Sequence, residues 1–324
     1  MIEQANLLTG RGKKSLWRWI QWAIVISLFF FLGKVIWENW GQVKEAPFTL
    51  KPFPLILSIF IFGLSHFVQI WAWYLITVKL GIAISIRETL ETWFYSQLGK
   101  YLPGKVWLLL GRFYFYRSKG KSKEMISVAL YLETATMVMA AGILFLVSLL
   151  YFPEMKLDSL RGQFWWVSLP LLLIFISLHP KVLQKVLNGF LVLFKKEPLS
   201  LPISYADAFR IILICVLSWV IGGAGFYLFV DSVFPVSYDQ ALFLTGSLAF
   251  SSILGLIAFF APGGLGVREG ALVYLLSFVM PTSVAVIVSV LTRLWTTVIE
   301  IGLTGMVYMF HRFRGGIQEK GKNG

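Results

Sequence analysis

Charged side chains inside long apolar runs are the residues of this sequence that could carry chemistry. Glu133 lies nine residues beyond Glu124 in one such run, and Arg293 and Glu300 lie seven residues apart in the last one. A charge at the centre of a bilayer costs roughly 2.5–3.5 kcal/mol, so these residues pair, line a watery cavity or bind a ligand. Two interpretations stay open: a shared polar interior that binds a ligand, or ion pairs that only fix helix packing.

Two interrupted apolar segments carry a second pattern. The segment at 99–112 reads GKYLPGKVWLLLGR, and the segment at 261–270 reads APGGLGVREG. Proline removes a backbone donor and glycine tolerates positive φ, so a Pro-Gly pair ends one half-helix sharply. The N–H groups of the next half-helix, with its positive dipole end, can then bind an anionic phosphate. The alternative is an ordinary surface loop.

We therefore expect a site for a phosphate-bearing headgroup between the two segments. Neighbours on a helix diverge by about 100°, so we expect Arg268 to face the site and Glu269 to be a partner. The expected binding residues are Pro103, Gly104, Lys105, Arg112, Glu133, Pro262, Gly263, Gly264, Arg268, Glu269, Arg293 and Glu300.

The composition indicates a membrane protein. Hydrophobic residues make up 57% of the chain and charged residues 14%, against roughly a quarter charged in soluble domains. We expect an all-α, polytopic bundle of six to eight crossings, at about 20 apolar residues each. The expected spans are 16–37, 54–78, 125–151, 164–178, 209–230 and 284–310, with the two interrupted segments at 89–116 and 241–280.

The order of these segments predicts one membrane domain, 1–324, with two halves and an inverted repeat. The halves are about 16–151 and 164–312, followed by a basic tail at 313–324. In such repeats the site forms at the midplane from broken helices. The residues do not decide whether 241–280 crosses twice or folds back.

Basic residues in short loops predict the orientation. The net charge is +13, and lysines and arginines gather in cytoplasmic loops of membrane proteins. The strongest cluster, 100–123, therefore predicts that 89–116 enters and leaves the cytoplasmic side of the cell membrane as a re-entrant hairpin. Both termini are expected in the cytoplasm. The same pattern argues against nucleic-acid binding, and 181–197 is expected to be an amphipathic interfacial helix.

No sequence pattern supports hydrolytic, metal or nucleotide chemistry. There is no GxSxG, HExxH or P-loop sequence, and His66, His179 and His311 lie far apart. The single cysteine, Cys215, lies in an apolar run. We expect no catalytic residue, metal or cofactor, and for His66 an interhelical hydrogen bond rather than a proton relay.

The two Pro-Gly segments, with Glu133 in the helix after the first, resemble the transmembrane region of the lysylphosphatidylglycerol synthase/flippase family. The resemblance runs from about residue 15 to 312, and Pro262–Glu269 is its most specific part. The membrane part is also similar to the C-terminal part of certain archaeal dolichyl-phosphate glycosyltransferases. The resemblance implies the translocating half without the aminoacyl-transferase domain.

The expected function is a lipid flippase that moves a headgroup between leaflets. The expected partners are an anionic or aminoacylated phospholipid, or a polyprenyl-phosphate-linked sugar. Two alternatives stay open: an accessory membrane subunit for a synthase or glycosyltransferase, and a membrane enzyme acting on lipid through Glu133 or Glu269.

Overall fold

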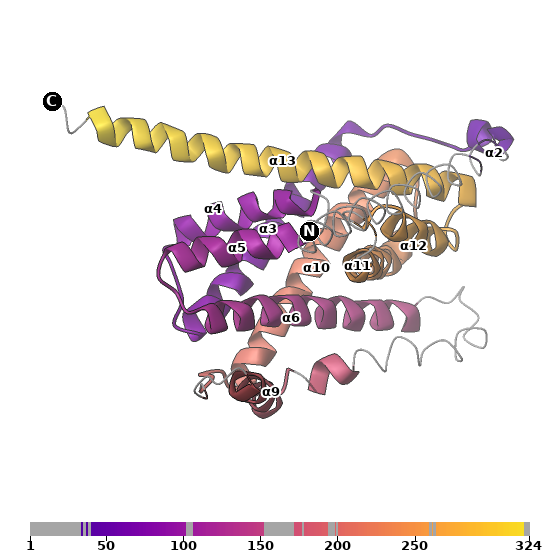
Figure 1. The fold of residues 1–324 in the computed structure, drawn as a ribbon. Helices are drawn as coiled ribbons and strands as arrows, with labels where there is room; N and C mark the ends of the chain where they lie inside the picture. The colour runs from indigo at the N-terminus through magenta and orange to yellow at the C-terminus, as the bar shows by residue number, and fades with distance from the viewer. Residues whose placement is uncertain are drawn as a thin grey trace, which may run out of the picture.

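The computed structural model describes residues 34, 37, 40–101, 106–151, 172–176, 178–193, 198, 200–258, 261 and 264–320. Within this part the chain forms ten α-helices and two short 3-10 helices, without strands (Figure 1). Five helical segments are long and apolar enough to cross a membrane. The expected spans at 16–37 and 164–178 lie largely outside the described residues, so the total number of crossings stays a prediction.

Four long helices form the frame of the molecule. They are α3 (Pro52–Lys79), α6 (Lys123–Leu150), α10 (Tyr205–Val233) and α13 (Thr282–Lys320). Side chains that cap free backbone N–H groups define two of their starts. Ser122 Oγ accepts from the amide of Met125 before α6, and Ser204 forms a reciprocal capping box with Asp207 before α10. These helices confirm four of the predicted spans.

A pair of shorter helices lies between each pair of long ones. The first pair is α4 (Ile86–Gln97) and α5 (Val106–Ser118). The short helix η1 (Leu98–Tyr101) lies between them in the chain. The second pair is α11 (Ala241–Ile257) and α12 (Val267–Leu276). The order long, short, short, long thus occurs twice along the chain.

The lengths of these shorter helices limit what they can cross. With 12 residues in α4, 13 in α5 and 10 in α12, they extend about 15–20 Å at 1.5 Å per residue. The hydrocarbon core of a bilayer is about 30 Å thick. Only α11, together with η2 (Tyr238–Gln240), reaches the length of a span. None of α4, α5 and α12 can cross the membrane by itself.

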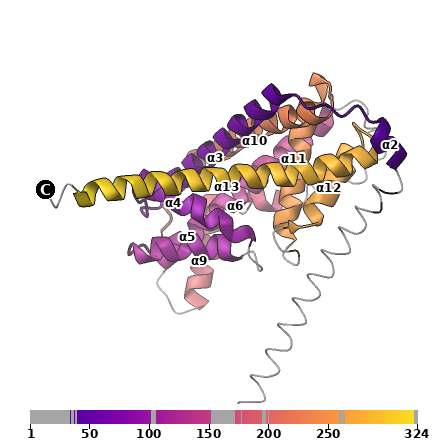
Figure 2. The same cartoon turned by 90° about the horizontal axis from the view of Figure 1, so that it is seen from above.

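The two short pairs lie at opposite ends of α13. Figures 1 and 2 place α4 and α5 beside the part of α13 that leads to the C-terminus, and α11 and α12 beside its beginning. Contacts of α13 with both α4 and α12 agree with these views. The remaining described helices, α2 (Trp40–Glu45) and α9 (Pro180–Leu193), lie at the periphery. Helix α9 confirms the helix expected near 181–197.

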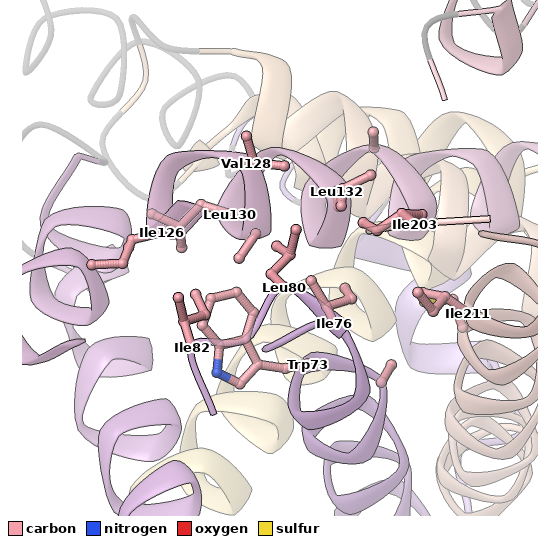
Figure 3. Packing of buried hydrophobic residues seen from close by; sticks show 14 of the residues in the cluster. Trp73, Ile76, Leu80, Ile82, Ile126, Val128, Leu130, Leu132, Ile203 and Ile211 are labelled. Atoms are coloured by element: carbon pink, nitrogen blue, oxygen red, sulfur yellow. The ribbon is translucent and has the colours of Figure 1, made fainter. Parts of the chain in front are cut away.

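Two hydrophobic clusters hold the two halves of the bundle. The first joins α3, α4, α5 and α6 with the beginning of α10. Figure 3 shows part of it, with Trp73 and Ile76 of α3, Leu132 of α6 and Ile211 of α10. The second joins α10, α11, α12 and α13 around Phe226 and Trp295. Helices α3 and α10 pack along each other and connect the clusters. Large apolar side chains on the outer faces, such as Phe60, are exposed and suit contact with lipid tails.

Glycine makes the bend between α11 and α12 possible. Gly264 has φ +72°, and a Cβ built there would lie 2.6 Å from the carbonyl oxygen of Gly255. The left-handed conformation costs an L-residue about 1–2 kcal/mol. The first pair shows a similar close approach, because a Cβ on Gly99 would lie 2.7 Å from the backbone of Trp107. Glycine therefore allows the chain to fold tightly inside the protein.

Replacing Gly264 with alanine should destabilise the protein. The expected loss is at least about 1–2 kcal/mol from the backbone strain, with the clash at Gly255 in addition. The matched control is Gly302→Ala, which meets nothing within 4 Å and gains up to about 1 kcal/mol of helix propensity. Thermal unfolding of the purified variants in detergent measures the difference. Equal melting temperatures for the two variants would contradict this account of the bend.

Candidate functional site

An ion pair between Arg112 on α5 and Glu133 on α6 lies in the interior of the first cluster. The Arg112 side chain is 1% exposed and its Nη1 donates to Glu133 Oε2. Its Nε donates to Ser96 Oγ over 2.9 Å. The other carboxylate oxygen of Glu133 accepts from Trp93 Nε1 over 3.2 Å. The pair therefore links α4, α5 and α6.

Two indole rings enclose the Arg112 guanidinium. Its carbon lies 5.0 Å from the ring centre of Trp73 and 5.3 Å from that of Trp93, distances at which a cation is attracted to a ring face. Both indoles are fully buried. In this structure all contacts given above for Arg112 are with other helices, as the ion-pair interpretation predicts. Its expected contact with a headgroup stays a prediction.

A second group of charges surrounds Glu300 on α13. Lys100, in η1, places its Nζ 2.5 Å from Glu300 Oε1. His66 on α3 places its Nε2 3.8 Å from the same oxygen. The Glu300 side chain is 9% exposed and the Lys100 side chain 28%. The connection between α4 and α5 is thus joined to the middle of α13.

The second short pair brings further charges to the same place. Arg268, in the first turn of α12, and Arg293 on α13 are both close enough for their positive charges to repel the Lys100 ammonium. Arg293 Nη1 lies 3.7 Å from Glu269 Oε1. We call Lys100, Arg268, Glu269, Arg293 and Glu300 the central charge cluster. It contains three cationic side chains and two carboxylates, so these five residues carry an excess of one positive charge.

Glu269 also holds the start of α12 in place. Its Oε2 accepts from the backbone N–H of Gly266 over 2.6 Å, and its own carbonyl oxygen accepts from Ser289 Oγ on α13. Glu269 is 2% exposed, whereas Arg268 is only partly buried. The two neighbours therefore differ in burial. Glu269 contacts α13 twice, through Ser289 and through Arg293.

The structure divides the expected site residues into two groups. Arg268, Glu269, Arg293 and Glu300 come together in the central charge cluster, whereas Arg112 and Glu133 form a separate pair on the other side of Trp93. Gly264 lies at the bend before α12. The expected residues Pro103, Gly104, Lys105, Pro262 and Gly263 lie outside the described part of the chain.

Sequence reasoning missed Lys100 and His66 as members of this site. Lys100 was assigned to a cytoplasmic loop because basic residues are frequent there. Its place in the GKYLPGK motif, beside an expected half-helix end, was the signal that could have identified it. No signal in the sequence associates His66 with Glu300, which follows it by more than 200 residues.

Comparison with known families matches nearly the whole chain. Residues 18–303 match the family described as "Lysylphosphatidylglycerol synthase TM region". No curated protein sequence matches the chain at a significant level. The matched range includes both short pairs, the Arg112–Glu133 pair and the central charge cluster.

Removing one partner of the Arg112–Glu133 pair should cost much more stability than removing both. A single buried charge left without its partner costs about 3–5 kcal/mol, whereas apolar replacement of both partners is often neutral. We expect Arg112→Met and Glu133→Leu each to lower the unfolding temperature strongly, and the double variant to recover most of the loss. A thermal double-mutant cycle in detergent measures the coupling.

The control for this cycle is a partly exposed ion pair of the same protein. Lys51 and Asp231 are 2.9 Å apart with side chains 43% and 22% exposed, and such pairs contribute about 0–1 kcal/mol. Lys51→Gln should therefore change the unfolding temperature little. Additive losses in the Arg112 and Glu133 variants would show that the two side chains are not coupled.

Proposed function

Because the chain belongs to the lysylphosphatidylglycerol synthase transmembrane family, we propose that it is a lipid translocator, which moves a headgroup between leaflets through the central charge cluster. The observation that carries this proposal is the meeting of both short pairs at α13, where Lys100 of the first pair contacts Glu300 and Glu269 of the second pair contacts Arg293. A scaffold that only anchors another protein has no need for five charges at one place, each of which is costly in the membrane.

The charges of the cluster suit a phosphate. Its one excess positive charge is balanced when an anionic group binds between Lys100, Arg268 and Arg293, and ion pairs of this kind are strong where water is scarce. The carboxylates of Glu269 and Glu300 could accept an ammonium group on an aminoacylated headgroup. Among the described residues, no donor forms a hydrogen bond with the buried Glu269 Oε1. The substrates proposed are anionic or aminoacylated phospholipids, or a polyprenyl-phosphate-linked sugar.

We further propose that the two short pairs are interrupted, re-entrant segments of an inverted repeat, the second of which includes α11, a helix that with η2 is long enough to cross. The repeated order of long and short helices supports this, as do the lengths of α4, α5 and α12, which are too small for a crossing. Movement of one half against the other would then open the central charge cluster first to one leaflet and then to the other. No catalytic residue is needed for such a movement, so the chain is proposed to act without enzymatic activity.

Substitution of Lys100 should abolish lipid movement without unfolding the protein. The assay is transbilayer movement of fluorescent phosphatidylglycerol in liposomes that contain the purified protein. Lys100→Gln and Arg293→Gln each remove one positive charge from the cluster, and we expect a loss of at least tenfold in rate. Glu300→Gln combined with Lys100→Gln tests whether an unpaired carboxylate causes the loss. Lys51→Gln, which lies outside the cluster, serves as the control.

The outcome of this assay decides between a translocator of these lipids and the accessory-subunit alternative. Loss in both cluster variants, with wild-type rates in the control, would support a headgroup site at the cluster. If the wild-type protein moves neither anionic nor aminoacylated lipid faster than empty liposomes do, the translocator proposal for these lipids fails. The accessory-subunit alternative then becomes testable by purification of the protein with a bound synthase or glycosyltransferase.

The proposed orientation places both termini of the chain in the cytoplasm of the cell. In this orientation Ser118, the last residue of α5, faces the cytoplasm, and Ser237, after α10, faces the outside. Both residues are exposed. The single cysteine is buried, so single cysteines can be introduced into a Cys215→Ala background. We expect a membrane-impermeant maleimide to label Ser237→Cys in intact cells, and Ser118→Cys only after permeabilisation. The reverse pattern would invert the orientation.

A further inference from the structure

The hydrogen bond of His66 determines which of its ring nitrogens can take up a proton. His66 Nδ1 lies 3.1 Å from the carbonyl oxygen of Phe62, one turn earlier on α3. A carbonyl oxygen only accepts hydrogen bonds, so Nδ1 carries the hydrogen. Nε2 is then the basic nitrogen of the neutral ring, and it is this atom that lies 3.8 Å from Glu300 Oε1.

We propose that His66 Nε2 is a proton-binding site coupled to the headgroup site, so that an anionic headgroup and a proton bind together. This inference rests on the proposed function, because it concerns the same cluster. It names the coupling ion of the translocator, which neither the composition nor the family indicates.

The shared oxygen of Glu300 provides the coupling. In the structure Lys100 Nζ lies 2.5 Å from this oxygen. When the His66 ring is neutral with its hydrogen on Nδ1, its Nε2 offers the oxygen a lone pair rather than a hydrogen. A proton on Nε2 would turn this contact into an attraction between an imidazolium and the carboxylate. The hold of Glu300 on Lys100 then weakens, and the Lys100 ammonium becomes available to a phosphate.

Protonation also changes the charge that a headgroup meets. With His66 neutral, the central charge cluster has an excess of one positive charge, and a proton on His66 raises this excess to two. An anionic headgroup therefore binds better after protonation. By reciprocity, a bound headgroup makes the proton bind better by the same factor.

The surroundings of His66 leave Glu300 as its main charged neighbour. The element α13 contributes Glu300 itself, and η1 contributes Lys100, which shares the Glu300 oxygen. From α4 the neutral Trp93 ring meets His66 edge-on with centroids 5.7 Å apart, and behind it lies the neutralised Arg112–Glu133 pair. At this level α10 approaches α3 with small residues, and Ser218 Oγ donates to the carbonyl oxygen of Ser65.

The test measures lipid movement as a function of pH. Falling pH makes protons more available, so it favours the state in which His66 Nε2 holds a proton. For fluorescent phosphatidylglycerol in liposomes with equal pH on both sides, we expect the wild-type rate to rise roughly tenfold from about pH 8 to about pH 6, a usual size for coupling between sites. His66→Gln should lose this rise. The matched control is His179→Gln, because His179 contacts the exposed Tyr205 far from the cluster.

The outcomes separate this inference from the proposed function. If the wild-type protein moves no lipid at any pH, the translocator proposal fails. If it moves lipid and His66→Gln shows the same rise with falling pH as His179→Gln, the proton site is refuted while the translocator stands. A flat profile in His66→Gln alone supports the coupled site.

A spectroscopic measurement keeps the inference testable if His66→Gln does not fold. The chain has three histidines, so ¹⁵N-labelled imidazole signals of the wild-type protein in detergent can be assigned with His179→Gln and His311→Gln. Near neutral pH, addition of phosphatidylglycerol should shift the His66 signals toward those of imidazolium. An unchanged His66 signal, in protein that binds the lipid, would overturn the proposal.

Discussion

The cost of placing a charge in the interior of a membrane protein is the constraint on which this structure depends. Each ionised group must find a partner there, because lipid tails offer it none. Arg112 and Glu133 meet the constraint with an ion pair whose guanidinium also lies against two indole rings. Glu300 meets it with Lys100. The helices are arranged so that these partners can reach one another.

The short helix pairs bring charged partners to the charged residues of α13. A helix that spans the membrane without a break ends at the membrane surface. A helix that stops partway ends inside the protein, here beside α13. Gly99 and Gly264 make such ends feasible, since a Cβ at either position would collide with backbone. One pair then brings Lys100 to Glu300 of α13, and the other brings Glu269 to Arg293 of α13. The central charge cluster is thus a consequence of where the backbone bends.

Trp93 connects the two groups of charges. Its indole N–H donates to Glu133, and its ring meets His66 edge to face. A shift of the first short pair would therefore affect the internal ion pair and the surroundings of Glu300 together. This arrangement ties the packing of α4 and α5 to the surroundings of Glu300.

Hydropathy predicted the class of this protein and the approximate places of its long helices α3, α6, α10 and α13, although α13 continues ten residues beyond the expected end. The Pro-Gly pairs predicted that α4–α5 and α11–α12 are interrupted. These features are local, because span length and proline or glycine act over a few neighbouring residues. The sequence also identified Glu133, Arg268, Glu269, Arg293 and Glu300 as residues that need a partner. It could not assign the partners: Lys100 and Glu300 are 200 residues apart, and only the packing of helix faces brought Lys100 and His66 to one carboxylate oxygen.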